Sequence, residues 1–208
     1  MIVKTNPDEF ENFVVDASNF KGNCEAVYFP ENVDDIVSVI KDANTNKTKV
    51  TVAGNGTGLT GARVPQNGIV IATDKLNKIL EINQKEFYAL VEPAVLLSDF
   101  QKEIKQQNLF YPPDPTETNC YIGGTVATNA SGAKTFKYGP TRDYVIGLQI
   151  VLPDGEVIDL ERGKQKANGY ALSLTTQSGK IISIQIPDYK FPAVKNASGY
   201  FVKKDMDA

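Results

Sequence analysis

The sequence has 208 residues, 41% of them hydrophobic, so the chain can bury a packed core, and its formal net charge is −3. The lysines are spread along the chain and form no basic field, which excludes nucleic-acid binding as the expected function. No apolar run approaches the roughly 20 residues of a membrane helix, and residues 1–10 carry charges where a signal peptide would be apolar. We therefore expect a cytoplasmic protein without a membrane span.

Histidine is absent from the sequence, and the two cysteines are Cys24 and Cys120. The absence of histidine excludes catalytic triads, histidine-ligated metals and a histidyl-linked cofactor. The cysteines lack a CxxC or metal-binding spacing, so we expect two reduced thiols and no metal site. Redox or other demanding chemistry would have to come from a bound cofactor.

Near the N-terminus we expect a short amphipathic helix over residues 7–18, because four apolar residues recur there at helical spacing: Phe10, Phe13, Val14 and Ala17. A strand over residues 26–30 follows. The next helix is expected to be capped by Asn32 and to end near Asn44, before a second strand over residues 49–53. This strand–helix–strand unit predicts two parallel strands beside each other.

The middle of the chain continues with a third strand over residues 68–72, and we place a lobe boundary near residues 74–80. A strand over residues 90–93 and a helix over residues 96–107, with Phe100 and Ile104 inward and Asn108 at its end, come next. Residues 111–115 are too rich in proline for a helix or a central strand and predict a stiff loop.

The last part of the chain predicts a β-hairpin, because apolar residues over 144–152 and 156–160 flank the turn sequence Pro153-Asp154-Gly155. Residues 181–187 fit either a strand or an extended arm. Antiparallel pairing should thus dominate the second lobe. The predicted fold class is α+β, with lobe 1 over about residues 1–74 and lobe 2 over about residues 75–208.

A buried-strand pattern over residues 50–53 runs directly into a loop that contains four glycines: Gly54, Gly56, Gly58 and Gly61. Glycine adopts positive φ at little cost, and a run of inward-pointing amides forms a concave site for an anion such as phosphate. The loop therefore indicates either a nucleotide cofactor or a glycine turn without a ligand.

Residues 56–61 also match GxGxxG, with Asp74 downstream, which taken alone suggests NAD. The Rossmann site requires a helix that starts inside the glycine run. Residues 63–68 contain helix breakers, and the next strand begins near Ile69, which leaves no room for that helix. A Walker A site also fails, since no Gly-Lys-Ser/Thr follows.

Residues 121–134 form a second unusual stretch, which consists mostly of small residues with hydroxyl and amide side chains. Such density lets a flat ligand lie close to the backbone, and it equally fits a packing site for a helix.

Four segments in order carry a resemblance to a known family: residues 52–62, 109–115, 122–132 and 137–148. With these, the chain resembles the FAD-binding domain of the vanillyl-alcohol oxidase/PCMH-type flavoproteins. Within it, the chain is most similar to the branch that holds glycolate oxidase, the D-lactate dehydrogenases and the D-2-hydroxyglutarate dehydrogenases. The resemblance covers roughly residues 26–207.

The resemblance implies that residues 1–208 are a two-lobed FAD-binding domain, with a small parallel βαβ lobe and a larger lobe based on an antiparallel sheet. The first glycine loop would wrap the pyrophosphate, residues 114–120 would run beside the flavin, and residues 128–131 would bond the ring or a phosphate. Covalent members carry a histidine where this chain has Thr57, so FAD should be noncovalent. The implied FAD-binding residues are Val52, Ala53, Gly54, Asn55, Gly56, Thr57, Gly58, Leu59, Thr60, Pro113, Asp114, Pro115, Thr116, Thr118, Gly123, Gly124, Ala127, Thr128, Asn129, Ser131, Gly132, Tyr138 and Val145.

The implied reaction is hydride transfer from C2 of a D-2-hydroxy acid such as glycolate, D-lactate or D-2-hydroxyglutarate to flavin N5. The catalytic base and the substrate site are expected outside this chain. Compared with the family, we expect a chain that is truncated at the C-terminus, with a naturally short or split subunit as the alternative, because the sequence shows neither the family's substrate domain nor the Gly-Ser-Glu-Gly-Thr-Leu-Gly run that usually follows the segment 195–200. We therefore expect the chain alone to be inactive, with an electron-acceptor subunit as a further candidate partner.

Three charged residues lie within the motifs: Asp114, Glu117 and Arg142. For each of them, a turn cap or a structural ion pair is at least as good an interpretation as a catalytic role. Two alternative functions stay open. One is a flavoenzyme similar to UDP-N-acetylenolpyruvoylglucosamine reductase, and the other is a non-catalytic FAD-binding or remnant module.

Overall fold

The computed structural model describes residues 1–192, 194 and 200–208, so most of the segment 195–200 lies outside the described residues. The chain divides into two compact units, residues 1–143 and residues 144–208. Each unit has a hydrophobic core of its own. The lobe boundary expected near residues 74–80 stays a prediction.

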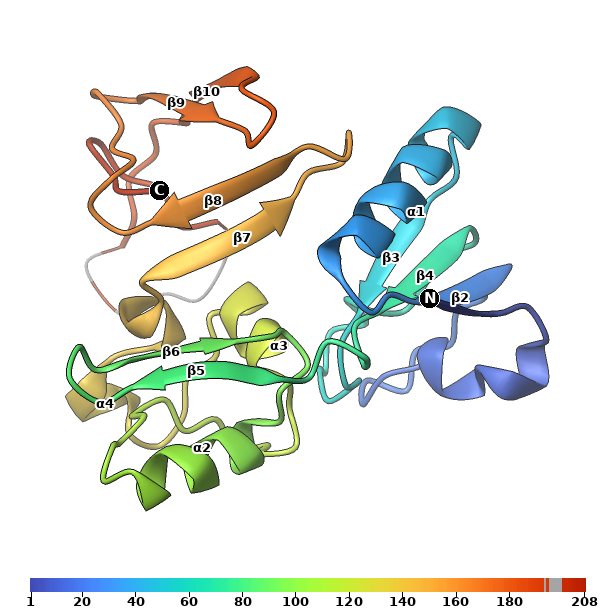
Figure 1. Ribbon diagram of the computed structural model, residues 1–208, viewed down its shortest axis with the longest axis horizontal. Coiled ribbons are helices and arrows are strands. Elements are labelled where there is room, and N and C mark those ends of the chain that lie inside the picture. The colour runs from blue at the N-terminus through green and yellow to red at the C-terminus, as the bar shows by residue number, and fades with distance from the viewer. Residues whose placement is uncertain (193, 195–199) are drawn as a thin grey trace. The chain divides into compact units, whose positions relative to one another are not determined.

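The N-terminal part of the first unit is built on a four-stranded sheet (Figure 1). The strand order is β1 (Ile2–Lys4), β2 (Ala26–Phe29), β4 (Ile69–Ala72) and β3 (Val50–Ala53). β4 pairs in parallel with both β2 and β3, and β1 is antiparallel to β2. The expectation that β2 and β3 lie beside each other is wrong. All four residues of β4 are buried, and a strand that is apolar on both faces belongs in the centre of a sheet.

Helix α1 (Val33–Asn46) covers one face of this sheet (Figure 1). The predicted cap is confirmed, because the Asn32 side-chain oxygen accepts a hydrogen bond from the backbone N–H of Asp35 at 2.8 Å. The helix ends two residues later than expected, and Lys47 closes it in the left-handed conformation with a φ of 55°.

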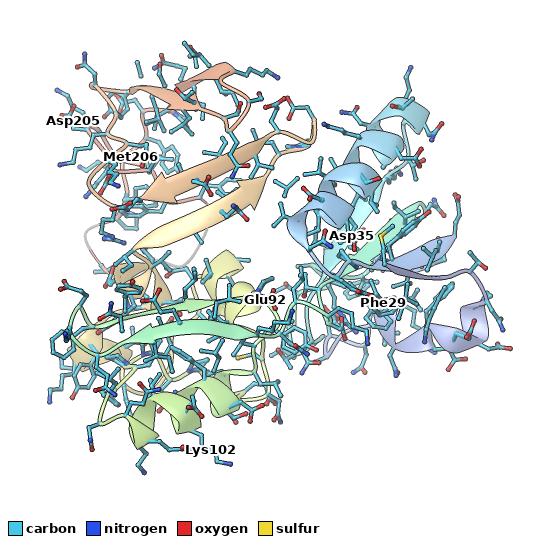
Figure 2. All side chains as sticks on the ribbon, in the orientation of Figure 1. Phe29, Asp35, Glu92, Lys102, Asp205 and Met206 are labelled. Atoms are coloured by element: carbon cyan, nitrogen blue, oxygen red, sulfur yellow. The ribbon has the colours of Figure 1, made fainter. Side chains whose placement is uncertain are left out.

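The core of this sheet has two layers, because successive side chains of a strand point to opposite faces. Ile69 and Ile71 of β4 pack with Val39 and Ala43 of α1. On the other face, Val70 and Ala72 pack with a cluster that includes Phe10 and Phe29, the latter labelled in Figure 2.

The helix expected over residues 7–18 does not form, and two 3₁₀ turns stand in its place: η1 (Pro7–Glu9) and η2 (Glu11–Phe13). An α-helix over residues 7–18 would use the carbonyl of Asn12 for the N–H of Asp16. Here the Asn12 carbonyl accepts a hydrogen bond from the guanidinium of Arg63 instead, and so does the carbonyl of Val15. Phe10 is nevertheless buried, so the periodic apolar residues identified core positions without identifying the backbone conformation.

The rest of the first unit contains the antiparallel hairpin β5 (Ile79–Asn83) and β6 (Tyr88–Val91), with helix α2 (Leu97–Gln106) against one of its faces. The predicted inward residues, Phe100 and Ile104, are buried, and Lys102 points away from the hairpin in Figure 2. Asn108, with a φ of 58°, follows the end of the helix as expected.

Three short helical segments complete the first unit and reach into the second: α3 (Ile122–Ala127), α4 (Thr135–Tyr138) and η3 (Thr141–Tyr144). Helix α3 lies within the stretch of small residues. The structure therefore supports the helix-packing interpretation for the start of that stretch.

In the second unit, β7 (Gly147–Val151) and β8 (Val157–Glu161) form the predicted hairpin. β9 (Ala171–Thr175) and β10 (Ile181–Gln185) form another antiparallel pair, so residues 181–185 are a strand and not an extended arm. The core of this unit is a cluster of five buried residues: Ile158, Ala167, Leu172, Leu174 and Ile186. None of the helices in the described part of the chain has the length and apolar character needed to cross a membrane.

Candidate cofactor-binding site

Residues 54–68 connect the adjacent parallel strands β3 and β4 without a helix. A Rossmann site needs a helix at this place, so the prediction that the loop is not such a site is confirmed. Gly56 and Gly61 adopt left-handed conformations, with φ of 73° and 71°. Side chains other than glycine and asparagine rarely adopt these angles, so the two glycines fix the course of the loop. We call residues 54–62 the glycine loop.

The backbone amides of the glycine loop are available to a ligand. Within the described residues, the N–H groups of residues 55–60 donate no hydrogen bond to a backbone or side-chain acceptor. A row of unpaired amides around a left-handed glycine is the arrangement that proteins use to hold phosphate oxygens. The loop therefore fits the diphosphate of a dinucleotide cofactor.

The glycine loop contacts Asp16 and Ala17, which belong to the N-terminal segment for which the sequence predicted a helix. The N–H of Ala17 donates to the carbonyl of Gly56 at 3.0 Å. Asp16 is 8% exposed, and its carboxylate accepts hydrogen bonds from the backbone and hydroxyl of Ser18. It also lies 4.0 Å from the position that a Cβ would take at Gly58.

Arg63 joins this segment to the loop. Its guanidinium donates to the carbonyls of Asn12, Val15 and Gly54, the bond to Val15 measuring 3.0 Å. The side chain occupies the space beneath Gly56, where an added Cβ would lie 2.5 Å from the guanidinium carbon. Gly56 is thus required both by its φ and by the presence of Arg63.

The charges beneath the loop influence each other. Burial raises the pKa of Asp16, but hydrogen bonds from Ser18, the Gly61 backbone and the positive charge of Arg63 outweigh it, so the pKa is lowered. Burial lowers the pKa of Arg63, while the carboxylates of Asp74 and Asp16 oppose that shift. Arginine stays protonated in proteins, so the guanidinium keeps its charge.

Two contacts connect the glycine loop to residues 119–121, at the start of the stretch of small residues. The side-chain amide of Asn55 donates to the carbonyl of Asn119 at 2.5 Å. The ring of Tyr121 lies beside Gly54, at 3.8 Å from the position of an added Cβ. The Tyr121 hydroxyl contacts Asp74 at 3.4 Å, and burial together with the Asp74 charge raises its pKa. The structure thus brings the glycine loop next to residues 119–121, which directly precede the third predicted segment.

The two glycines of α3 have different surroundings. A Cβ at Gly123 would lie 2.7 Å from the ring of Pro93, so close packing against the chain after β6 explains this glycine. A Cβ at Gly124 would meet no atom within 4 Å. No packing contact explains Gly124, which is consistent with its predicted place against the cofactor.

Residues 128–132 use part of their polar groups within the protein. The Thr128 hydroxyl donates to the Gly124 carbonyl at 2.8 Å, and the Asn129 side-chain oxygen accepts from the Arg142 backbone at 2.9 Å. A Cβ at Gly132 would lie 1.6 Å from the Asp114 carbonyl oxygen, so this glycine permits the close approach of two backbones. The hydrogen bonds expected from residues 128–131 to the flavin ring or a phosphate stay predictions.

The charged residues of the proline-rich loop are held by local contacts. Asp114 forms a 3.0 Å ion pair with Lys134, and Glu117 accepts a hydrogen bond from the backbone of Asn119 at 2.8 Å. The structure therefore supports the ion-pair interpretation for Asp114 and the turn-cap interpretation for Glu117.

Two further predicted positions are Tyr138 and Val145. Tyr138 makes an edge-to-face contact with Phe110, with ring centroids 5.6 Å apart. Val145 belongs to the second unit, where its carbonyl accepts two hydrogen bonds from Arg162, at 2.7 and 3.0 Å. The other predicted residues lie in segments described above, at Val52, Ala53, Thr57, Leu59, Thr60, Pro113, Pro115, Thr116, Thr118, Ala127 and Ser131.

Three residues of this site were missing from the sequence prediction: Asp16, Arg63 and Tyr121. Asn119 lies within the segment 114–120 that was predicted to run beside the flavin, Tyr121 directly follows that segment, and Arg63 directly follows the glycine loop. Asp16 carries no sequence signal, because only the folded chain brings it under the loop.

A family model described as the FAD binding domain matches residues 24–161, which is more than half of the chain. The chain belongs to this family. The resemblance inferred from the four motifs is thereby confirmed, and FAD is confirmed as the family's cofactor. Noncovalent attachment stays a prediction.

Curated relatives of this FAD-binding domain agree with the predicted branch. The chain is 40% identical over 154 residues to a D-lactate dehydrogenase of Anaerostipes hadrus, covering 73% of this chain and 32% of the relative. It is 33% identical over 168 residues to the glycolate oxidase protein GlcD of Bacillus subtilis, covering 76% and 36%. A D-2-hydroxyglutarate dehydrogenase of Stutzerimonas stutzeri is 32% identical over 174 residues, covering 82% and 38%. The FAD-binding domain thus spans about a third of the length of these relatives.

Solved structures show the same fold. 6-Hydroxy-D-nicotine oxidase from Arthrobacter nicotinovorans superposes with a TM-score of 0.70 at 20% identity, covering 77% of this chain and 35% of the oxidase. Alkyldihydroxyacetonephosphate synthase gives a TM-score of 0.67 at 20% identity, covering 76% and 34%. The predicted α+β fold of the PCMH-type FAD-binding domains is confirmed.

Proposed function

We propose that this chain is the FAD-binding part of a flavin-dependent dehydrogenase that acts on a D-2-hydroxy acid. The observation that carries the proposal is the row of unpaired amides over residues 55–60. The names of the relatives, D-lactate dehydrogenase, glycolate oxidase and D-2-hydroxyglutarate dehydrogenase, support the substrate class.

The residues of the site divide the work of holding FAD. The glycine loop amides bind the diphosphate, and the Asn55 side chain keeps the loop next to the segment that carries Asn119. Gly124 leaves room for the cofactor beside α3. When bound, FAD supplies the hydride acceptor of the reaction.

The domain lobes proposed here are residues 1–74 and 75–208, and FAD is held without a covalent bond because Thr57 occupies the position of the linking histidine. Asp114 and Glu117 are engaged in local contacts, so neither is proposed as the catalytic base. A base outside this chain would remove the hydroxyl proton of the substrate. An electron-acceptor subunit and a cytoplasmic location complete the proposal.

Titration of the full chain with FAD tests this proposal. We expect quenching of flavin fluorescence with saturation, and ADP should compete because it carries the diphosphate that the loop binds. Thr57→Glu places a negative charge in the loop and should weaken FAD binding by at least about tenfold, since like charges a few ångströms apart near a protein surface repel by a few kcal/mol. The matched variant Thr57→Val should bind like the wild type. Absence of binding at excess FAD would refute the proposed role of the chain.

Acid precipitation of the FAD complex tests the mode of attachment. All of the flavin should appear in the supernatant, because the described site offers no histidine to link it. Flavin retained in the precipitate would contradict noncovalent binding.

A further inference from the structure

The family match begins at residue 24, but the glycine loop rests on residues that precede it. The backbone of Ala17, the carboxylate of Asp16, and the carbonyls of Asn12 and Val15 all lie beneath the loop or bond the arginine that supports it. We call residues 12–18 together with Arg63 the loop platform.

We propose that the loop platform presets the glycine loop for the diphosphate, with Arg63 and Asp16 as positioning residues that do not touch the cofactor. This inference rests on the proposed function, because it assigns a cause to the conformation in which the amides of residues 55–60 are unpaired.

Peptide geometry links the platform to the amides. In a trans peptide, the carbonyl of one residue and the N–H of the next point in opposite directions, and the described chain contains no cis peptide. The Gly54 carbonyl is held by Arg63 and the Gly56 carbonyl by the N–H of Ala17, both on the platform side. The N–H groups of Asn55 and Thr57 are therefore directed away from the platform, toward the side where an anion can bind.

Arg63 suits this role because its donors form a rigid planar fork. Three carbonyl oxygens, from Asn12, Val15 and Gly54, converge on this one guanidinium. The ammonium of a lysine carries the same charge, but it is a compact group that cannot reproduce the fork. The ring contact of Arg63 with Phe13, at 5.6 Å between guanidinium carbon and ring centroid, fixes the plane further.

The charge of Arg63 has a second effect. Asp16 is nearly buried next to the loop, and a carboxylate at this place would repel a diphosphate. The positive charge of the guanidinium interacts with the carboxylates of Asp74 and Asp16 and offsets part of this negative charge. Removal of Arg63 should thus release the loop and expose the anion site to an unbalanced carboxylate.

Two measurements on the full chain test the inference, with Arg63→Met, Arg63→Lys and the exposed control Lys102→Met. In FAD titrations, Arg63→Met should weaken binding by about tenfold or more and Arg63→Lys by less, since a lost bond from a charged donor changes affinity by about that factor. ADP affinity should fall in parallel. Lys102→Met should bind as the wild type does.

Amide hydrogen exchange of FAD-free protein provides the second measurement. The Ala17 N–H, which donates to Gly56, should lose protection in Arg63→Met, while the Val70 amide in the central strand should keep it. Asp16→Asn should show a smaller loss of Ala17 protection, and it serves as the second variant if Arg63→Met folds poorly.

The outcomes separate this inference from the proposed function. A wild type that fails to bind FAD would refute the proposed function, and exchange at Ala17 would then still decide whether the platform holds the loop. Unchanged Ala17 protection in the variants would overturn the inference. Wild-type FAD affinity in Arg63→Met would overturn it as well.

Discussion

At the scale of single residues, the site depends on atoms that hold backbone groups in place more than on side chains that face a ligand. Arg63 and Asp16 bond main-chain groups, and Gly132 allows two main chains to approach. Substitutions at such positions should change stability and cofactor affinity through the backbone.

Asp16 should make the protein sensitive to acid. Burial raises the pKa of Asp16, but the hydrogen bonds from Ser18 and Gly61 together with the charge of Arg63 outweigh this effect, so the folded-state pKa is lowered. The stabilisation is therefore fully present above the ordinary pKa of about 4 and is lost as the pH falls through the lower folded-state value. In urea titrations, wild type should exceed Asp16→Asn in stability at pH 6, and the difference should shrink below pH 4. A difference independent of pH would contradict the role of the carboxylate charge.

Two glycines in the stretch of small residues over 121–134 should respond oppositely to substitution by alanine. Gly132→Ala brings a Cβ to 1.6 Å from the Asp114 oxygen, so the backbone must shift at a cost of about 1–3 kcal/mol of folding free energy. Gly124→Ala meets open space within a helix and should stabilise FAD-free protein by about 0.5–1 kcal/mol. Thermal unfolding checks both. FAD titration of Gly124→Ala then reports whether the cofactor needs this space, and unchanged affinity would argue against the predicted contact.

At the scale of elements, local signals identified those helices and strands whose stability depends on local chemistry. The cap at Asn32, the inward face of α2 and the hairpin turn at residues 153–155 were all correctly predicted, because each leaves a signal in the order of neighbouring residues. The segment over residues 7–18 was not, because its carbonyls bond Arg63, which is distant in sequence. The same reason explains why β4 could not be placed between β2 and β3.

In the candidate site, too, the part with a local sequence signal was predicted and the part that depends on distant residues was not. The glycine loop was visible in the sequence, since positive φ and close approach leave a glycine signature at Gly56 and Gly61. The support beneath it was invisible, because a buried carboxylate such as Asp16 looks like any surface aspartate until the chain folds.

The cap of α1 gives a prediction at this scale. Asn32→Ala removes the acceptor for the Asp35 N–H and should lower the free energy of unfolding by about 1 kcal/mol, while Asn32→Gly should cost only a few tenths. Urea denaturation measures both. Wild-type stability of Asn32→Ala would indicate that the side-chain oxygen contributes nothing.

At the scale of the whole molecule, the two units have separate cores, so damage to one should leave local protection in the other. Ile71 is 1% exposed in the first unit, and Leu174 is 6% exposed in the second. Truncation of either to alanine should cost about 2–5 kcal/mol in its own unit. Hydrogen exchange should show Leu174→Ala weakening protection of β8 to β10 while the amides of β4 keep theirs. Equal losses in both units would show that they unfold together.

The position of β4 has a consequence for synthesis on the ribosome. β3 has no strand partner other than β4 among the described strands, and β2 has only the short edge strand β1 without it. Until residues 69–72 emerge from the ribosome, the edges of β2 and β3 that pair with β4 are therefore unpaired. Helix α1 then has only part of the surface against which it packs. The sheet can close only when the chain beyond the glycine loop inserts between strands already made. Nascent chains that end inside the loop should consequently be cut readily by proteases, and resistance should appear abruptly once the central strand has emerged.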